Sequence, residues 1–220
     1  MMGIPFFTPH GTIDLLDLKP ADLAADKIAD GLAKTNRFNG TTPVPWSVAS
    51  HSVVVDMICP PALRGHGLLH DAHEYILGDW VTPAVEFVAR PYETVMSNVV
   101  NSALDRAKLA LDARIGQAWS LPEMDDFEDL WVCDRVVFEA ELHVFFRVSL
   151  DDLAFANDEN FTEAVYMVRT FPKDTEWRAA RDLWLDRARE LARVGLLRLP
   201  AEANHPDCMV QPETTLENVK

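Results

Sequence analysis

The chain has 220 residues, 48 % of them hydrophobic and 25 % charged, which is the length and composition of one globular domain. Its formal net charge of −15 argues against a nucleic-acid polymer as the ligand, because the phosphate backbone would be repelled. No apolar run is long enough to span a bilayer, and the N-terminal residues lack the basic and apolar segments of a signal peptide. The three cysteines show no paired spacing, which is typical of a reducing compartment. We therefore expect a cytoplasmic protein without a membrane segment.

Hydrophobic periodicity predicts a succession of helices along the chain. Residues 1–20 are punctuated by Pro and Gly and predict an extended, turn-rich entry. Helices are expected at 22–35, 47–59, 62–77, 84–90, 92–112, 130–148, 160–170 and 175–195. Ser47 is a good N-cap for the second helix, Pro60 and Pro61 end it, and Gly78 suits the end of the third.

The predicted fold class is all-α, because no segment shows the alternating pattern of a strand. The apolar, periodic stretch 130–148 is expected to be a central helix. We expect a compact single-domain helical bundle over residues 1–200. Residues 201–220 contain Pro206 and Pro212 and predict a loosely held polar tail.

Residues of the metal-ligand type interrupt three of the apolar helices. The adjacent His70 and Asp71 follow two leucines, where a buried carboxylate is costly unless it is paired or coordinated. His51 breaks the run SVASHSVVVDMI, and Asp134 breaks WVCDRVVF. Each residue alone is also compatible with a satisfied polar group in the core. Together they favour a divalent metal, and imidazole with carboxylate suits Mn, Fe, Co, Ni or Zn.

The order His51, His70-Asp71 and Asp134 resembles that of the HD-domain metal-dependent phosphohydrolases. The resemblance is to the small bacterial and phage branch with 5′-deoxynucleotidases and deoxynucleotide triphosphohydrolases, and it covers roughly residues 10–150. It is carried by the segments IDLLDLKPADL, NRFNGTTPVPWSVASHS, GLLHDAHEYILGDWVTP and CDRVVFEAE. It implies an HD-type helical bundle in which these four residues bind a divalent metal, with Mg added to the metals above.

The resemblance also implies roles for residues around the ligands. Glu74 and Asp79 match an acidic pair that activates or relays the attacking water. Arg37 matches an arginine that contacts the substrate phosphate, and Phe38 stands where an aromatic residue supports the nucleoside. Thr82-Pro83 matches a Thr-Pro step of this branch.

One departure bears on the substrate. Relatives often carry Lys soon after the Thr-Pro step, whereas this chain has Ala84, Val85 and Glu86. A phosphate-binding cation is then missing or comes from elsewhere, with Arg64 and Arg90 as candidates.

The residues themselves leave several alternatives open. Glu74 lies four residues after His70, on the same face of a continuous helix, where it accepts a proton from a metal-bound water or supports a ligating imidazole. Asp79 is otherwise a cap for the next segment. Trp80 and Tyr75 line a base pocket or belong to the core.

Three further residues near the ligands have simpler interpretations. We expect His66 and His73 at the surface or beside the ligands, with a second metal at His73 as the alternative. Glu141 shares a helix face with Asp134, and a salt bridge with a nearby Arg is expected.

The predicted function is the metal-dependent hydrolysis of the 5′-phosphoester of a deoxynucleotide, giving deoxynucleoside and phosphate from a monophosphate. One alternative is a deoxynucleotide triphosphohydrolase that releases triphosphate. A second alternative is a non-catalytic helical binding module. The expected partner is a small-molecule nucleotide, and relatives often dimerise, so a homo-oligomer is also considered.

Overall fold

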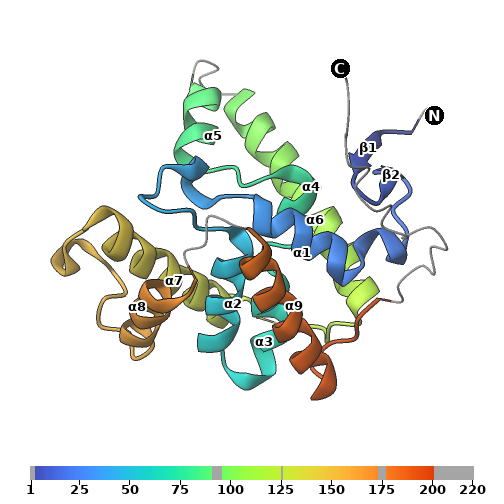
Figure 1. Cartoon of the computed structure of the whole chain (residues 1–220). Coiled ribbons are helices and arrows are strands. Elements are labelled where there is room, and N and C mark those ends of the chain that lie inside the picture. The colour runs from blue at the N-terminus through green and yellow to red at the C-terminus, as the bar shows by residue number, and fades with distance from the viewer. Residues whose placement is uncertain (1–2, 91–95, 125, 173–176, 201–220) are drawn as a thin grey trace, which may run out of the picture.

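Helix α2 (Val48–Ile58) lies at the centre of the bundle in the computed structural model, which describes residues 3–90, 96–124, 126–172 and 177–200 (Figure 1). Every residue of α2 except Met57 is buried. A helix that is apolar on all sides is stable only where neighbours cover all of it. Helices α1, α3, α7, α8 and α9 pack around it. The stretch expected to be central, 130–148, instead forms an outer wall, since Trp131 in it is 55 % exposed.

The fold is mainly α-helical, as predicted. The remaining helices are α1 (Ala25–Lys34), α3 (Arg64–Leu69), α4 (Glu74–Leu77), α5 (Thr82–Ala89), α6 (Met96–Trp119), α7 (Glu128–Phe146), α8 (Phe161–Thr170) and α9 (Trp177–Arg193). Short 3₁₀ turns cover Pro20–Leu23, Arg37–Gly40, Pro61–Leu63 and Leu150–Asp152. Helix α6 continues seven residues beyond its predicted end at 112, and the predicted tail 201–220 lies outside the described residues. Among the described helices, none is long and apolar enough to cross a membrane.

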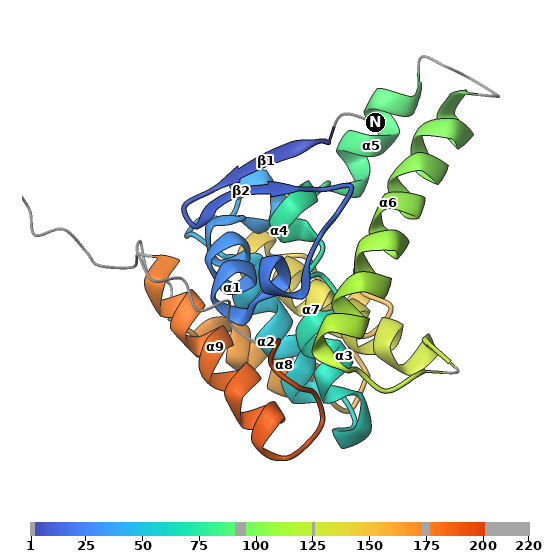
Figure 2. The ribbon, with the colours of Figure 1, turned by 90° about the vertical axis from the view of Figure 1, so that its right-hand side faces the viewer.

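The N-terminal entry forms a two-stranded antiparallel hairpin, which corrects the expectation that no strand is present. Strands β1 (Pro5–Thr8) and β2 (Gly11–Asp14) pair with Phe6 opposite Ile13. Four-residue strands are too short for alternation to be recognised in the sequence. The hairpin turns at Gly11, whose φ of +116° suits glycine. The Phe6 ring meets Tyr75 edge-on at 6.5 Å, so the hairpin packs against α4 (Figure 2).

The helix predicted at 62–77 is broken in the middle, which is a second correction. Residues 70–73 form a turn between α3 and α4. The amide of Ala72 donates to the carbonyl of Leu69 and that of Glu74 to Asp71, both at 3.0 Å and both three residues back. Such 3₁₀-like bonds tighten the chain to about three residues per turn, which places Asp71 and Glu74 on one side. Gly78 ends α4 with φ +76°, as expected for a C-terminal glycine.

Two apolar cores flank α2 and hold it in place. The first lies among α1, α6 and α9, and Trp119 meets Trp184 there at 5.7 Å. The second lies among α2, α7 and α8 and includes Trp46 and Val137. Each fully buried large side chain of this kind contributes about 1.5–3 kcal/mol. The polar residues of α2 are therefore fixed between two rigidly packed layers.

Candidate metal centre

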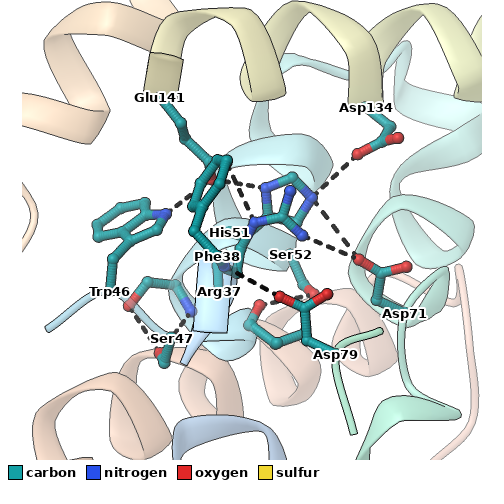
Figure 3. A network of polar contacts seen from close by, with 12 residues as sticks. Arg37, Phe38, Trp46, Ser47, His51, Ser52, Asp71, Asp79, Asp134 and Glu141 are labelled. Atoms are coloured by element: carbon teal, nitrogen blue, oxygen red, sulfur yellow. Dashed lines mark hydrogen bonds and ion pairs between the residues drawn. The ribbon is translucent and has the colours of Figure 1, made fainter. Parts of the chain in front are cut away.

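The candidate metal ligands come from α2, from the turn after α3 and from α7, and Figure 3 shows His51, Asp71 and Asp134 next to one another. His51 lies on α2, His70 and Asp71 follow α3, and Asp134 lies on α7. The side chains of His51, His70 and Asp71 each place one ligand atom within 4.8 Å of the others. Asp71 Oδ2 is 3.1 Å from His70 Nε2 and 3.8 Å from His51 Nε2.

Asp134 approaches this group from the side of the two imidazoles. Its Oδ1 is 3.0 Å from His51 Nε2 and 3.6 Å from His70 Nε2. Residues up to 83 positions apart thus come together as the sequence predicts. Their binding of a metal stays a prediction.

Both imidazoles are oriented through the nitrogen that faces away from the cluster. His70 Nδ1 lies 2.8 Å from the carbonyl oxygen of Gly67, and His51 Nδ1 lies 2.8 Å from Glu141 Oε1. These oxygens only accept, so each Nδ1 is the donor. Each Nε2 then points into the cluster, and that of His70 is buried without a hydrogen bond. Metal-binding histidines are held in this way by a partner on the other ring nitrogen.

The charges of the cluster balance one another. Burial opposes protonation of His70, but Asp71 and Asp134 outweigh it and raise its pKa well above the usual value. Burial likewise opposes ionisation of Asp134, yet the hydrogen bond to His51 and the nearby His70 imidazole lower its pKa well below the usual value. Protons and a divalent cation compete for the same Nε2 lone pairs, so metal binding here would release protons.

Glu141 is the residue whose importance the sequence reveals least. The predicted salt bridge with an arginine is present, since Arg37 Nε lies 3.1 Å from Glu141 Oε2. Glu141 also accepts hydrogen bonds from Trp46 Nε1 at 2.7 Å and from His51 Nδ1 at 2.8 Å. Its side chain is completely buried, and Arg37 and His51 lower its pKa against the effect of burial. Glu141 therefore fixes the orientation of His51.

Arg37 is buried and forms ion pairs with two carboxylates. It is 9 % exposed, and its Nη1 lies 3.5 Å from Asp71 Oδ2 in addition to the Glu141 contact. Burial lowers its pKa, but Glu141 and Asp71 outweigh this and the pKa is raised. Two carboxylates thus share much of the positive charge that Arg37 presents.

Asp79 supports the loop that follows Arg37. Phe38 and Asn39 have left-handed backbone angles, with φ of +55° and +52°. The Phe38 amide donates to Asp79 Oδ2 at 3.2 Å. The capping alternative for Asp79 is wrong, because α5 begins after Val81 without a side-chain cap. Burial, opposed by Arg37, raises the pKa of Asp79.

A cavity of about 600 Å³ opens beside the ligands. Its walls include Asp71, Glu74, Asp79 and Asp134, together with the aromatic residues Phe38, Trp80, Phe138 and Phe146. The rings of Phe38 and Phe138 stack at 5.7 Å, and Phe146 meets Phe38 at 5.1 Å.

The aromatic residues near α4 differ in position. Trp80 is 47 % exposed in the cavity wall, so the alternative of a core residue is wrong for it. Tyr75 belongs to the core, and its hydroxyl donates to the Asp22 carbonyl.

Arg135 is a cavity residue that the sequence reasoning missed. Its guanidinium lies 4.5 Å from the centre of the Phe138 ring. The only available signal was its place next to Asp134. Arg64 and Arg90, the cations suggested instead, do not line this cavity; Arg64 lines another depression together with Arg187.

Glu74 and His73 lie close to Asp71, in a group that does not include His51. Both are buried, which excludes the surface placement considered for His73. Glu74 Oε2 has no hydrogen-bond partner, and burial together with Asp71 and Asp79 raises its pKa to about 9. Glu74 lines the cavity. It reaches this position because the chain turns at residues 70–73, and not because it shares the face of a continuous helix with His70.

Comparison with known proteins leaves the activity open. No family model matches the chain. An uncharacterised protein of Rhodobacter capsulatus is 37 % identical over 119 residues, which is 50 % of this chain. The chain spans 57 % of the length of that curated relative.

Proposed function

We propose that this chain is a divalent-metal-dependent hydrolase of a deoxynucleotide phosphoester, with His51, His70, Asp71 and Asp134 as the metal ligands. The observation that carries the proposal is that two oriented Nε2 atoms lie 3.0–3.8 Å from the carboxylates of Asp71 and Asp134, which also line the cavity. His70 Nε2 is buried without a hydrogen bond, although carboxylate oxygens of Asp71 and Asp134 lie 3.1 and 3.6 Å away, and a cation between these groups would satisfy all of them. The order of these residues, which resembles the HD phosphohydrolases, supports the same proposal.

The residues fit a divalent cation by their chemistry and charge. Neutral imidazole and carboxylate suit Mn, Fe, Co, Ni or Zn, and Mg is the weaker fit because it prefers oxygen. A cation bound there would supply Lewis acidity and lower the pKa of water.

The cavity walls divide the remaining work. Glu74 has a raised pKa of about 9, so it would act as a base in the carboxylate form that a neighbouring cation favours. Its Oε2 would take a proton from the attacking water as the bond to phosphorus forms and would pass that proton to the leaving 5′ oxygen as the second bond breaks. Arg37 and Arg135 present guanidinium groups to the phosphate. The aromatic side chains of Phe38, Trp80 and Phe138 line the cavity and offer apolar surface to the base.

Monophosphate is the proposed substrate, and triphosphate is the second candidate. Arg37 is already shared by two carboxylates, so little positive charge remains for a polyphosphate. Arg135 favours the triphosphate, because it adds a cation to the same cavity. A non-catalytic binding module is the third candidate, against which the unpaired Glu74 at the cavity speaks.

The test is a panel of deoxynucleoside mono- and triphosphates with Mn²⁺, Co²⁺, Mg²⁺ and Zn²⁺, scored separately for phosphate, pyrophosphate and triphosphate. We expect phosphate from a monophosphate, and no release from the Asp71→Ala variant. The exposed Asp186→Ala variant is the matched control and keeps wild-type rates. Triphosphate release with a preference above tenfold, worth ~1.4 kcal/mol of transition-state binding, would select the second candidate. If no product forms with any nucleotide and metal, the non-catalytic binding module is the candidate that remains.

A further inference from the structure

Three ligand-type side chains form a second group next to the candidate metal centre. Asp71, His73 and Glu74 each place one ligand atom within 4.8 Å of the others. Asp71 belongs to both groups, and a carboxylate has two oxygens with which to bridge two cations. The group arises from the 3₁₀-like turn at residues 70–73, which brings Asp71 and Glu74 to one side.

His73 is oriented as a ligand would be. It is 4 % exposed, and its Nδ1 lies 2.8 Å from Oδ1 of Asp112 on α6. A carboxylate only accepts, so Nδ1 carries a proton, and in the neutral imidazole Nε2 has the lone pair that a cation would use. This carboxylate–imidazole arrangement repeats the one between Glu141 and His51.

Two buried atoms of this group lack any hydrogen-bond partner. They are Nε2 of His73 and Oε2 of Glu74, on side chains that are at least nine-tenths buried. A lone pair on Nε2 and a carboxyl oxygen would satisfy each other through a shared proton, but no such bond is formed between them. Both atoms therefore face a place where a cation would satisfy them together.

We propose that Asp71, His73 and Glu74 bind a second divalent cation, with Asp112 as the positioning residue for His73. The donor set is one imidazole and two carboxylates, which suits Mn²⁺. The proposal extends the proposed function, since Asp71 is shared with the first site. A cation on Oε2 of Glu74 excludes a proton from the same atom. When the second site is filled, this oxygen therefore cannot take the proton from the attacking water.

The test is Mn²⁺ binding to the full chain, measured by equilibrium dialysis and calorimetry, with electron paramagnetic resonance to detect coupling between two Mn²⁺ ions. We expect two ions per wild-type chain and a coupled spectrum. His73→Ala and Asp112→Asn should reduce binding at the second site at least tenfold and remove the coupling, while one ion remains. His66→Ala, which changes a half-buried histidine of α3 outside both groups, keeps both ions. Circular dichroism establishes that each variant is folded.

The outcomes separate the two proposals. One ion in the wild type and one in His73→Ala overturns the second site and leaves the first. Two ions in the wild type and two in folded His73→Ala also overturns the assignment to His73. No bound ion in any variant contradicts the first site and the proposed function as well.

Discussion

The two sides of the candidate metal centre differ in how well their polar atoms are paired. On the α2 side, Glu141 contacts Arg37, Trp46 and His51, and the imidazole of His51 has a partner at both nitrogens. On the side of the 70–73 turn, His70 Nε2, His73 Nε2 and Glu74 Oε2 lack a hydrogen bond although they are buried. Buried polar groups are paired in most folded proteins. We therefore infer that the contacts on the α2 side hold His51 in position, whereas the unpaired atoms at the 70–73 turn are available to bind a cation.

The largest effect is expected from removing ligands on the unpaired side. His70→Ala and Asp71→Ala should lose metal and activity together, because each substitution removes one metal ligand that the remaining ligands cannot replace. Metal affinity should fall by more than the ~10–100-fold seen when only an outer partner is changed. Metal content and turnover are measured on the same preparations, with the exposed His10→Ala as control. Full metal content in Asp71→Ala would end the assignment of this ligand.

Glu74 is the next test of the unpaired side. Glu74→Gln should keep the first cation and lose ~10²–10⁴-fold in turnover, the usual cost of removing a group that transfers a proton. The isosteric change keeps the volume of the side chain, so thermal stability serves as the check on folding. Near wild-type turnover with metal bound would show that Glu74 carries no proton in the reaction.

The paired side should respond differently. Glu141→Gln keeps the shape but removes the charge that Arg37 and His51 share, and breaking such a buried pair costs about 3–5 kcal/mol of stability. Metal affinity should fall ~10–100-fold, since His51 loses its anionic partner. Chemical denaturation and metal titration give the two quantities. A loss of activity with unchanged stability and affinity would contradict the supporting role.

The smallest expected effect is on stability as a function of pH in protein treated with a chelator. The folded pKa of His70 is raised, so its contribution is fully present below about 6.5 and is lost as pH rises through the folded pKa. The lowered pKa of Asp134 matters only below about 4. The melting temperature should fall above neutral pH, by about 2–4 °C for each kcal/mol lost. An equal slope in His70→Ala would rule out this cause.

The proximity of the candidate ligands could be predicted from the sequence, because polar residues of the ligand type stand out in apolar stretches. His51 and Asp134 interrupt apolar stretches of α2 and α7, and His70 and Asp71 follow the apolar end of α3; the structure brings the four side chains together. Some helix ends are also set by nearby residues. The Ser47 side chain, for example, accepts a hydrogen bond from the Ser50 amide at the start of α2. Local patterns are therefore enough for the start of α2 and the end of α4, but not for the end of α6 or the break at residues 70–73.

What the sequence did not predict depends on contacts between distant residues. The Glu141–His51 bond joins positions 90 apart, and the break at residues 70–73 depends on a tight turn that hydrophobic periodicity does not reveal. Arg135 enters the cavity because of how α7 packs, which no local pattern shows. The hairpin at residues 5–14 is too short to produce a strand signal.

The central claim is that the cluster around His51 binds a divalent cation, and elemental analysis of the purified full chain tests it most directly. At least one equivalent of a divalent metal per chain should remain after dialysis, as expected for ligands held by the fold. A chelator should remove it, and soaking in Mn²⁺ or Co²⁺ should restore it. Less than about 0.2 metal per chain, with no gain on soaking, would contradict the account.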